Sequence, residues 1–279
     1  MTILKKSKAA LTMVVAIAMV FCLSMGAFAK EYPVSYGQNE THATNSAINV
    51  KVAVEGRTTA YKEVNVSLNA KTPSQKVIDA MLAVNADATK GIIFGTNATT
   101  PVNAESTYFS CVNGEGGSGV GYSGWCFRIN GGFPMDSSGF GTTIATATIT
   151  DGDVISFFID DPISESSATK FTRANVITKT PSQIVVNVKE SHQYFAPAPS
   201  YDWVISNFAK YIGATVELYS GSTASGTIIS TATTNGFDGN ATISNLNLTQ
   251  GGTYTVKVLG NVSGNYLTST STTETFTLN

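Results

Sequence analysis

Residues 121–133 read GYSGWCFRINGGF and hold one of the two tryptophans in the chain. Asn130-Gly131 is the signature of a type I′ turn, in which both central residues need a positive φ. Before this turn the apolar residues alternate with others, as in a strand, so Trp125, Phe127 and Ile129 share one face and the two residues between them point away. The stretch predicts a β-hairpin whose tryptophan either fills a core or offers an aromatic platform to a ligand.

The segments around this hairpin carry strand and helix patterns. Residues 48–56 and 61–70 alternate and are rich in β-branched residues, which predicts two strands. Apolar residues recur at helical spacing after Thr72, a candidate N-cap, and predict a helix over 73–86. Asp151-Gly152 marks another tight turn. One helix across a mixed sheet gives an α+β, β-grasp-like domain over residues 48–160.

The rest of the chain has an all-β pattern. Residues 161–175 are polar and Ser-rich, which predicts a linker. Over 176–279, short alternating segments are separated by Gly, Asn and Ser, and this rhythm is typical of a β-sandwich. Inside this second domain, residues 191–211 are rich in aromatics and proline, and we expect a long loop with one helical turn there. The expected fold class is therefore α+β followed by all-β.

The N-terminus has the parts of a secretory signal peptide. Over residues 1–29, a basic start leads into the apolar run LTMVVAIAMVFCLSM and then the small-x-small pattern Ala27-Phe28-Ala29. The apolar run is shorter than the roughly 20 residues of a membrane span. We expect a secreted or cell-surface protein, with no membrane association after cleavage. Residues 30–47 are polar without periodicity and predict a flexible leader.

Charge and cysteine content narrow the function further. After residue 29 the chain has 19 acidic and 14 basic residues and a net charge of −5, because three of the 17 Lys and Arg residues lie before it. This balance gives no support to nucleic-acid binding. Cys111 and Cys126 remain after cleavage, and an even count in an oxidising exterior predicts one disulfide, with two reduced thiols as the alternative.

Residue types needed for catalysis are sparse. The two histidines, His42 and His192, stand beside no nucleophile motif, and no metal-binding spacing occurs. Asp151 and Asp153 are the right residue types for calcium, but DGD is first of all a turn sequence. The glycines between 114 and 124 lack the Lys and the helix of a phosphate-binding loop. We predict that the chain is not an enzyme and requires neither metal nor cofactor.

The sequence GWCFRING at 124–131, followed by ITDGDVI at 149–155, resembles the transcobalamin C-terminal-like domain. That family carries G-W-x-Y-x-x-N-G and then a strand–turn with D-G-D, and it has a helix after its first hairpin. Cys126 departs from the pattern, since the family more usually has an apolar residue there. The resemblance implies a β-grasp-like fold over about 48–160 and a corrinoid, such as cobalamin, as ligand. The large helical domain of the animal carriers has no counterpart here.

Two hypotheses on function stay open. The first is a binding module for a corrinoid or another small molecule at the 114–135 hairpin, where an aromatic rim would hold a flat ligand. The candidate ligand-binding residues are Tyr122, Trp125, Phe127 and Phe133. The second is a structural or adhesive surface protein that self-associates or contacts the cell envelope. The second domain resembles transthyretin-like or immunoglobulin-like surface modules, which are usually spacers or stalks.

Overall fold

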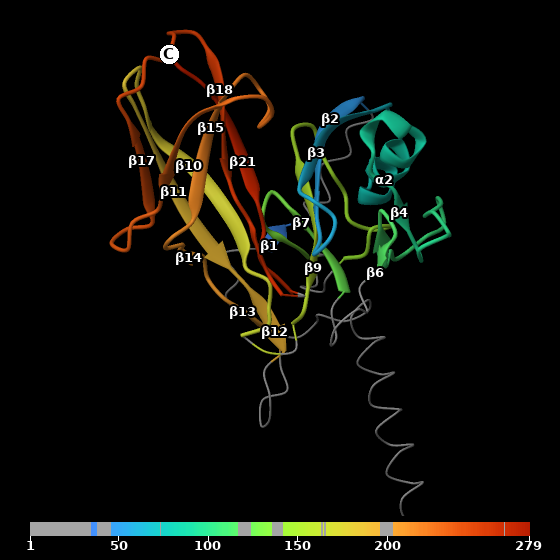
Figure 1. Cartoon of the computed structure of the whole chain (residues 1–279). Coiled ribbons are helices and arrows are strands. Elements are labelled where there is room, and N and C mark those ends of the chain that lie inside the picture. Colours follow the sequence, from blue (N-terminus) through green and yellow to red (C-terminus); the bar gives the residue numbers. More distant parts are fainter. Residues whose placement is uncertain are drawn as a thin grey trace, which may run out of the picture. The chain divides into compact units, whose positions relative to one another are not determined.

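The computed structural model describes residues 35–37, 46–72, 74–116, 124–135, 142–162, 164, 166–195, 203–264 and 266–279. Within these residues the chain is mostly β-strand, with one α-helix and one short 3-10 helix (Figure 1). The chain forms two compact units. The first contains residues 35–37 and 46–53 with Glu63–Gly116 and Phe127–Ser156, and the second contains Val54–Lys62, residues 124–126 and Phe157–Asn279. The tip of the first hairpin therefore belongs to the second unit.

A four-stranded sheet has the order β3-β2-β9-β7. Its strands are β3 (Lys62–Leu68), β2 (Ile48–Glu55), β9 (Val154–Asp160) and β7 (Gly124–Ile129). The strands predicted at 48–56 and 61–70 are confirmed as β2 and β3. Alternate residues of β2, Ile48, Val50, Val52 and Val54, are at most 3% exposed, as the period of two requires.

Helix α2 (Val77–Ala86) begins later than the predicted position 73. Lys76, rather than Thr72, is the N-cap, and its backbone N–H donates to Asp79 Oδ2 at 2.8 Å. The N–H groups of Val77 and Ile78 donate to the carbonyls of Ala147 and Ile144, at 3.0 and 2.9 Å. Lys76 forms a bridge with Thr148. This strand-like pairing of residue 76 with the 144–148 segment delays the start of the helix.

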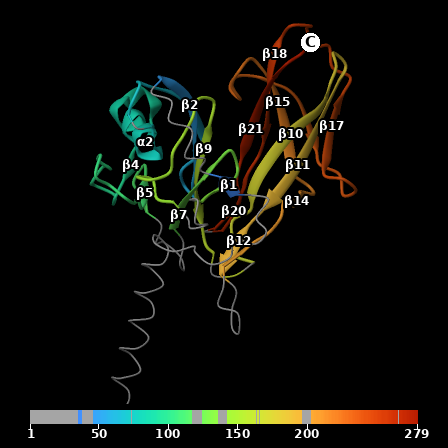
Figure 2. The same ribbon diagram turned by 180° about the vertical axis from the view of Figure 1, so that it is seen from behind.

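Five apolar side chains of α2 are buried: Val77, Ile78, Ala80, Met81 and Val84. The helix lies beside the β2–β3 pair in both views of the molecule (Figures 1 and 2). At its C-terminal end, the Asn85 amide pairs with both backbone groups of Phe94 in β4 (Phe94–Gly95), at 2.7 and 2.8 Å. The Asn85 side chain thus makes the two hydrogen bonds to Phe94 that the backbone of a neighbouring strand would make.

The second unit contains two four-stranded sheets. One joins β10 (Phe171–Lys179), β11 (Gln183–Ser191), β14 (Ala209–Lys210) and β17 (Asn240–Ser244); the other has the order β16-β15-β18-β21. The second set is β16 (Ile228–Thr233), β15 (Thr215–Ser220), β18 (Thr253–Val258) and β21 (Thr272–Thr277). All their pairings are antiparallel. Apolar residues from both sheets form one hydrophobic cluster, including Ile184, Val186, Val188, Val216, Leu218 and Val256.

The edges of these two sheets approach each other. β10 contacts β21, and β16 contacts β17. The carboxylate of Glu274 in β21 accepts a hydrogen bond from the backbone of Val176 in β10, while burial raises the pKa of Glu274. Strand edges covered in this way are less available for pairing with another chain.

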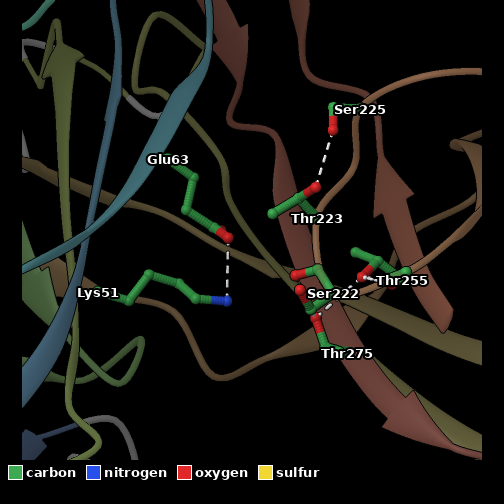
Figure 3. A network of polar contacts seen from close by, with 8 residues as sticks. Lys51, Glu63, Ser222, Thr223, Ser225, Thr255 and Thr275 are labelled. Atoms are coloured by element: carbon green, nitrogen blue, oxygen red, sulfur yellow. Dashed lines mark hydrogen bonds and ion pairs between the residues drawn. The ribbon is translucent and has the colours of Figure 1, made fainter. Parts of the chain in front are cut away.

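Hydroxyl groups tie a surface loop to the sheet that contains β18 (Figure 3). Thr255 Oγ1 lies 2.8 Å from the carbonyl oxygen of Gly221, to which it donates, and 3.0 Å from Thr275 Oγ1. Thr275 in turn bonds to the carbonyl of Ser222 at 3.4 Å. Thr255 is fully buried, and these hydrogen bonds satisfy its hydroxyl group.

In the first unit, Lys51 and Glu63 join β2 to β3 by an ion pair of 2.9 Å (Figure 3).

Three predicted irregular segments contain strands. In the predicted leader, β1 (Ser35–Gly37) pairs in parallel with β8 (Phe133–Met135). In the predicted loop 191–211, β12 (Gln193–Phe195) pairs with β13 (Trp203–Ile205), so the expectation of a loop there is corrected within the described residues. The predicted linker 161–175 includes the first residues of β10, which begins at Phe171, and Thr169 before this strand is 2% exposed. The remaining strands are β5 (Cys111–Val112), β6 (Glu115–Gly116), β19 (Asn261–Ser263) and β20 (Tyr266–Ser269).

Candidate functional site

The turn after β7 has the predicted conformation. Asn130 and Gly131 have φ values of 52° and 73°, and both positive values match a type I′ turn. The flanking residues close it, since Ile129 N donates to Gly132 O at 3.1 Å and Gly132 N donates to Ile129 O at 2.8 Å. The tight turn predicted from Asn130-Gly131 is confirmed.

The DGD sequence forms a second turn held by its own carboxylates. Gly152 has a φ of 84°, a conformation that favours glycine. Asp151 Oδ1 accepts the backbone N–H of Asn49 at 2.7 Å. Asp153 is 5% exposed, and its Oδ2 accepts the backbone N–H of Thr150 at 2.8 Å. The Asp153 carboxylate thus closes the turn, and the Asp151 carboxylate ties the turn to β2.

The two turns are hydrogen-bonded to each other. Asn130 Nδ2 donates to Asp153 Oδ1 at 2.7 Å, and Asn130 Oδ1 accepts the backbone N–H of Val154 at 2.9 Å. The backbone N–H of Asn130 donates to the carbonyl of Val154 at 2.8 Å. Asn130, which follows β7, therefore bonds to the carboxylate of Asp153 and to both backbone groups of Val154 at the start of β9. We call this set of three bonds the Asn130–Asp153 lock.

The candidate ligand-binding aromatics have different environments. Trp125 is 8% exposed, so its ring is part of a core and not a surface platform. Phe127 in β7 and Phe133 in β8 are half-buried. Tyr122 lies outside the described residues, as does the glycine-rich stretch 117–123. Of the four predicted residues, Phe127 and Phe133 are the two that are partly exposed in the described structure.

Arg128 departs from its expected position. A charged residue that points away from the apolar face of β7 is expected at a surface, yet Arg128 is 1% exposed. Its Nη1 donates to the carbonyl of Gly131 at 3.4 Å. The only sequence signal was a lone charge between Phe127 and Ile129 in an otherwise uncharged strand, and the face of β7 that carries Arg128 is in fact covered at this position.

The predicted disulfide is not present. Cys111 and Cys126 are both free thiols. Cys111 lies in β5 and is 2% exposed, whereas Cys126 lies in β7 and packs against the cluster of Phe158, Phe171 and Leu267. The Cys126 thiol thus fills an apolar environment, as free cysteines often do, and the Cys111 thiol is buried in β5. The even cysteine count was therefore misleading.

Mass spectrometry of the exported protein, prepared without reductant, is expected to show two free thiols. Native alkylation should modify Cys111 more slowly than Cys126, because Cys111 is more buried and burial raises the pKa of its thiol. The control is alkylation in denaturant, where both should react. A recovered peptide pair linked through Cys111 and Cys126 would contradict this assignment.

Sequence reasoning missed a serine beside a histidine. Ser206 Oγ lies 3.4 Å from His192 Nδ1, and it also accepts the backbone N–H of His192 at 2.9 Å. The backbone N–H of Ser206 donates to the carbonyl of His192 at 2.9 Å. These bonds close the end of the β12–β13 pair. The 3.4 Å contact is long for an activated hydroxyl, so the geometry accounts for strand closure better than for a nucleophile.

A buried carboxylate was also not anticipated. Glu55, at the end of β2, is 9% exposed and belongs to the second unit. It accepts hydrogen bonds from the backbone N–H of Ser271 and from Ser271 Oγ, the latter at 2.8 Å. A Cβ at Gly260 would lie 2.8 Å from Glu55 Oε1, so only glycine fits beside it. Burial raises the pKa of Glu55, against the opposing effects of Ser271 and Lys257.

Glu55 should make stability fall as pH rises from its ordinary pKa of 4.5. The folded protein holds the Glu55 proton more tightly than the unfolded chain does, so the stabilisation is complete below this pKa and is lost toward the raised, folded pKa. Urea unfolding of wild type and Glu55→Gln at several pH values should show a wild-type advantage that shrinks with rising pH. Glu105→Gln, at an exposed carboxylate, is the control, and a growing wild-type advantage would contradict the assignment.

Comparison with known proteins identifies neither a family nor a function for this chain. The chain matches no family model, no curated protein and no solved structure. In the described part of the chain, no helix is long and apolar enough to cross a membrane. Among the same residues, no group of three His, Cys, Asp or Glu side chains is placed to hold a metal ion.

Proposed function

We propose that this chain is an exported, non-enzymatic binding protein whose domain over 48–160 takes a corrinoid or a similar flat small molecule. The observation that supports it is the Asn130–Asp153 lock. The two motifs that resemble the transcobalamin C-terminal-like domain lie about 20 residues apart in sequence, and they are hydrogen-bonded to each other. A chance match of two turn sequences would not require this contact.

The fold of this domain is consistent with the β-grasp arrangement that the resemblance implies. One helix, α2, buries its apolar face beside the hairpin of β2 and β3, and β9 and β7 extend the sheet. In the proposed site, Phe127 and Phe133 contact the ligand, while Trp125 supports the strand from the core. Aromatic rings present flat apolar area to a flat ligand.

The test is a titration of residues 30–279 with cyanocobalamin and with cobinamide, followed by tryptophan fluorescence. Saturable quenching at micromolar concentrations would support the proposal. Free tryptophan in the same titrations controls for absorption by the corrinoid. Equal quenching of the protein and of free tryptophan would reject corrinoid binding.

The second candidate is a structural or adhesive surface protein. It is favoured by the second unit, whose two sheets share one hydrophobic cluster in the manner of a β-sandwich stalk module. Sedimentation velocity over a range of concentrations separates the two candidates. Growing assemblies would favour the structural function, and a monomer at all concentrations would remove self-association from it.

A further inference from the structure

We infer that Asn235 is a site of spontaneous covalent modification, where the side-chain amide becomes a carboxylate through a cyclic imide formed with Gly236. Asparagine is a thermolabile residue type. A glycine after it leaves the following backbone nitrogen unhindered, because glycine has no Cβ. The chain has three Asn-Gly pairs, at 113–114, 130–131 and 235–236. Their hydrogen bonds differ, and these differences single out Asn235.

The reaction needs only the protein and water. The backbone nitrogen of Gly236 loses its proton and attacks Cγ of Asn235, and the bond between Cγ and Nδ2 breaks. The nitrogen of the amide takes up the proton and leaves as ammonia, so the product is the cyclic imide. Water then opens the imide at Cγ, which gives aspartate, or at the main-chain carbonyl carbon of residue 235, which gives isoaspartate.

The side-chain carbonyl of Asn235 already receives the donors that this reaction needs. Its Oδ1 accepts the backbone N–H of Phe237 at 3.0 Å and that of Asp238 at 3.1 Å. The attack places negative charge on this oxygen, and donors aimed at a developing negative charge lower the barrier, as in an oxyanion hole. Lys210 Nζ donates to the carbonyls of Gly236 and Phe237, at 3.2 and 3.1 Å, and adds a positive charge to the same turn.

The attacking and leaving nitrogens are both accessible. Asn235 and Gly236 are exposed. Neither Nδ2 of Asn235, which leaves, nor the backbone N–H of Gly236, which attacks, donates a hydrogen bond to the described residues. No hydrogen bond of these two nitrogens within the described part of the chain therefore has to break before the attack.

The other two Asn-Gly pairs are held by contacts that oppose the same reaction. Asn113 and Asn130 have positive φ values of 51° and 52°, and their amides bond to other segments. Asn113 Oδ1 accepts the backbone N–H of Ile93 at 2.7 Å, and its Nδ2 donates to the carbonyl of Gly91 at 3.4 Å. Asn130 Nδ2 donates to Asp153 at 2.7 Å within the lock described above. Attack on either Cγ would have to break these bonds first.

The modification acts on a turn that has little room to adjust. Asn235 N donates to the carbonyl of Asn240 at 2.9 Å, and Val188 N donates to the carbonyl of Gly239 at 2.9 Å. A Cβ on Gly239 would lie 2.9 Å from the carbonyl oxygen of Val188. Aspartate at position 235 keeps the acceptor and adds a negative charge, whereas isoaspartate adds a methylene group to the main chain. We therefore expect isoaspartate to loosen the pairing of β17 with β11.

Peptide mapping by mass spectrometry measures the three sites separately. Trypsin places each Asn-Gly pair in its own peptide, namely residues 91–128, 129–170 and 211–257. The chain after residue 29 is incubated at mildly alkaline pH, in native buffer and in urea. In native buffer we expect Asn235 to deamidate at least about tenfold faster than Asn113 and Asn130, because it combines two N–H donors with an untied amide nitrogen. In urea the three rates should converge.

Gly236→Ala is the matched variant. The φ of Gly236 is not positive, and an added Cβ would meet only Cγ2 of Ile212 at 4.0 Å, so alanine fits without strain. This variant should melt like wild type and deamidate at Asn235 at least about tenfold more slowly, because its Cβ hinders the attacking nitrogen. Asn235→Ser keeps an oxygen that can accept the same N–H groups, and it should show no mass gain at position 235.

Three results would overturn the inference. They are a native rate at Asn235 no faster than at Asn113 and Asn130, the same ranking of the three rates in urea, and an unchanged rate at Asn235 in Gly236→Ala. The first two use the wild-type chain alone, so they do not depend on the folding of a variant. The inference is independent of corrinoid binding, because it concerns a turn of the second unit and its readout is a change of mass.

Discussion

Trp125→Ala is expected to destabilise the protein by about 3–5 kcal/mol, as truncation of a large buried aromatic does. The ring is 8% exposed, so its removal leaves a cavity that the neighbouring strands fill only partly. Chemical denaturation monitored by far-UV circular dichroism measures the effect, because the variant loses one of the two tryptophan fluorophores.

Tyr108→Ala is the matched control for this prediction. Tyr108 is an aromatic residue that is 50% exposed. Its truncation should change the free energy of unfolding by no more than about 0.5 kcal/mol. If the two variants proved equally stable, Trp125 would be a surface ring, and the assignment of Phe127 and Phe133 as the ligand contacts would lose its basis.

Asp153→Ala is expected to cost about 1–3 kcal/mol, because it removes a carboxylate that is 5% exposed and accepts three hydrogen bonds. Asp153 accepts hydrogen bonds from the backbone N–H and the Oγ1 of Thr150, at 2.8 and 3.2 Å, and from Asn130 Nδ2 at 2.7 Å. The change also breaks the Asn130–Asp153 lock. Urea denaturation gives the stability, and amide exchange at Val154 reports whether the second half of the lock opens as well.

The matched control lies on the same turn. Asp151 is exposed and accepts one backbone N–H, from Asn49 at 2.7 Å. Asp151→Ala should therefore cost less than Asp153→Ala, and it should leave exchange at Val154 unchanged. Equal effects of the two changes would mean that the DGD turn acts only as a turn and that the lock adds nothing.

Local patterns predicted the strands and tight turns well. The alternation at 48–56 and 61–70 and the Asn130-Gly131 pair have their effect within a few residues, so the sequence alone contains the information. Helix α2 shows the limit of this reasoning. Its start at Val77, rather than 73, is set by the carbonyls of Ala147 and Ile144, which lie far away in the sequence.

Tertiary contacts explain what the sequence did not predict. The burial of Arg128 depends on cover over its own face of β7, which no periodicity reports. Cys111 is buried in β5 while Cys126 in β7 packs against Phe158, Phe171 and Leu267, a difference that the cysteine count does not contain. Arg173, Lys189 and Lys210 lie side by side through strand register, so residues that are dispersed in the sequence become neighbours only in the sheet.

The most direct test of the proposed function is a calorimetric titration of cobinamide into residues 30–279 of wild type and of Phe133→Ala. We predict one-site binding in wild type with a micromolar Kd, and about tenfold weaker binding in Phe133→Ala because a ligand-contacting ring is lost. Phe237→Ala, which removes a ring that is 90% exposed in the second unit, should bind like wild type. Absence of binding in wild type, or identical binding by all three proteins, would contradict a corrinoid site at the hairpin.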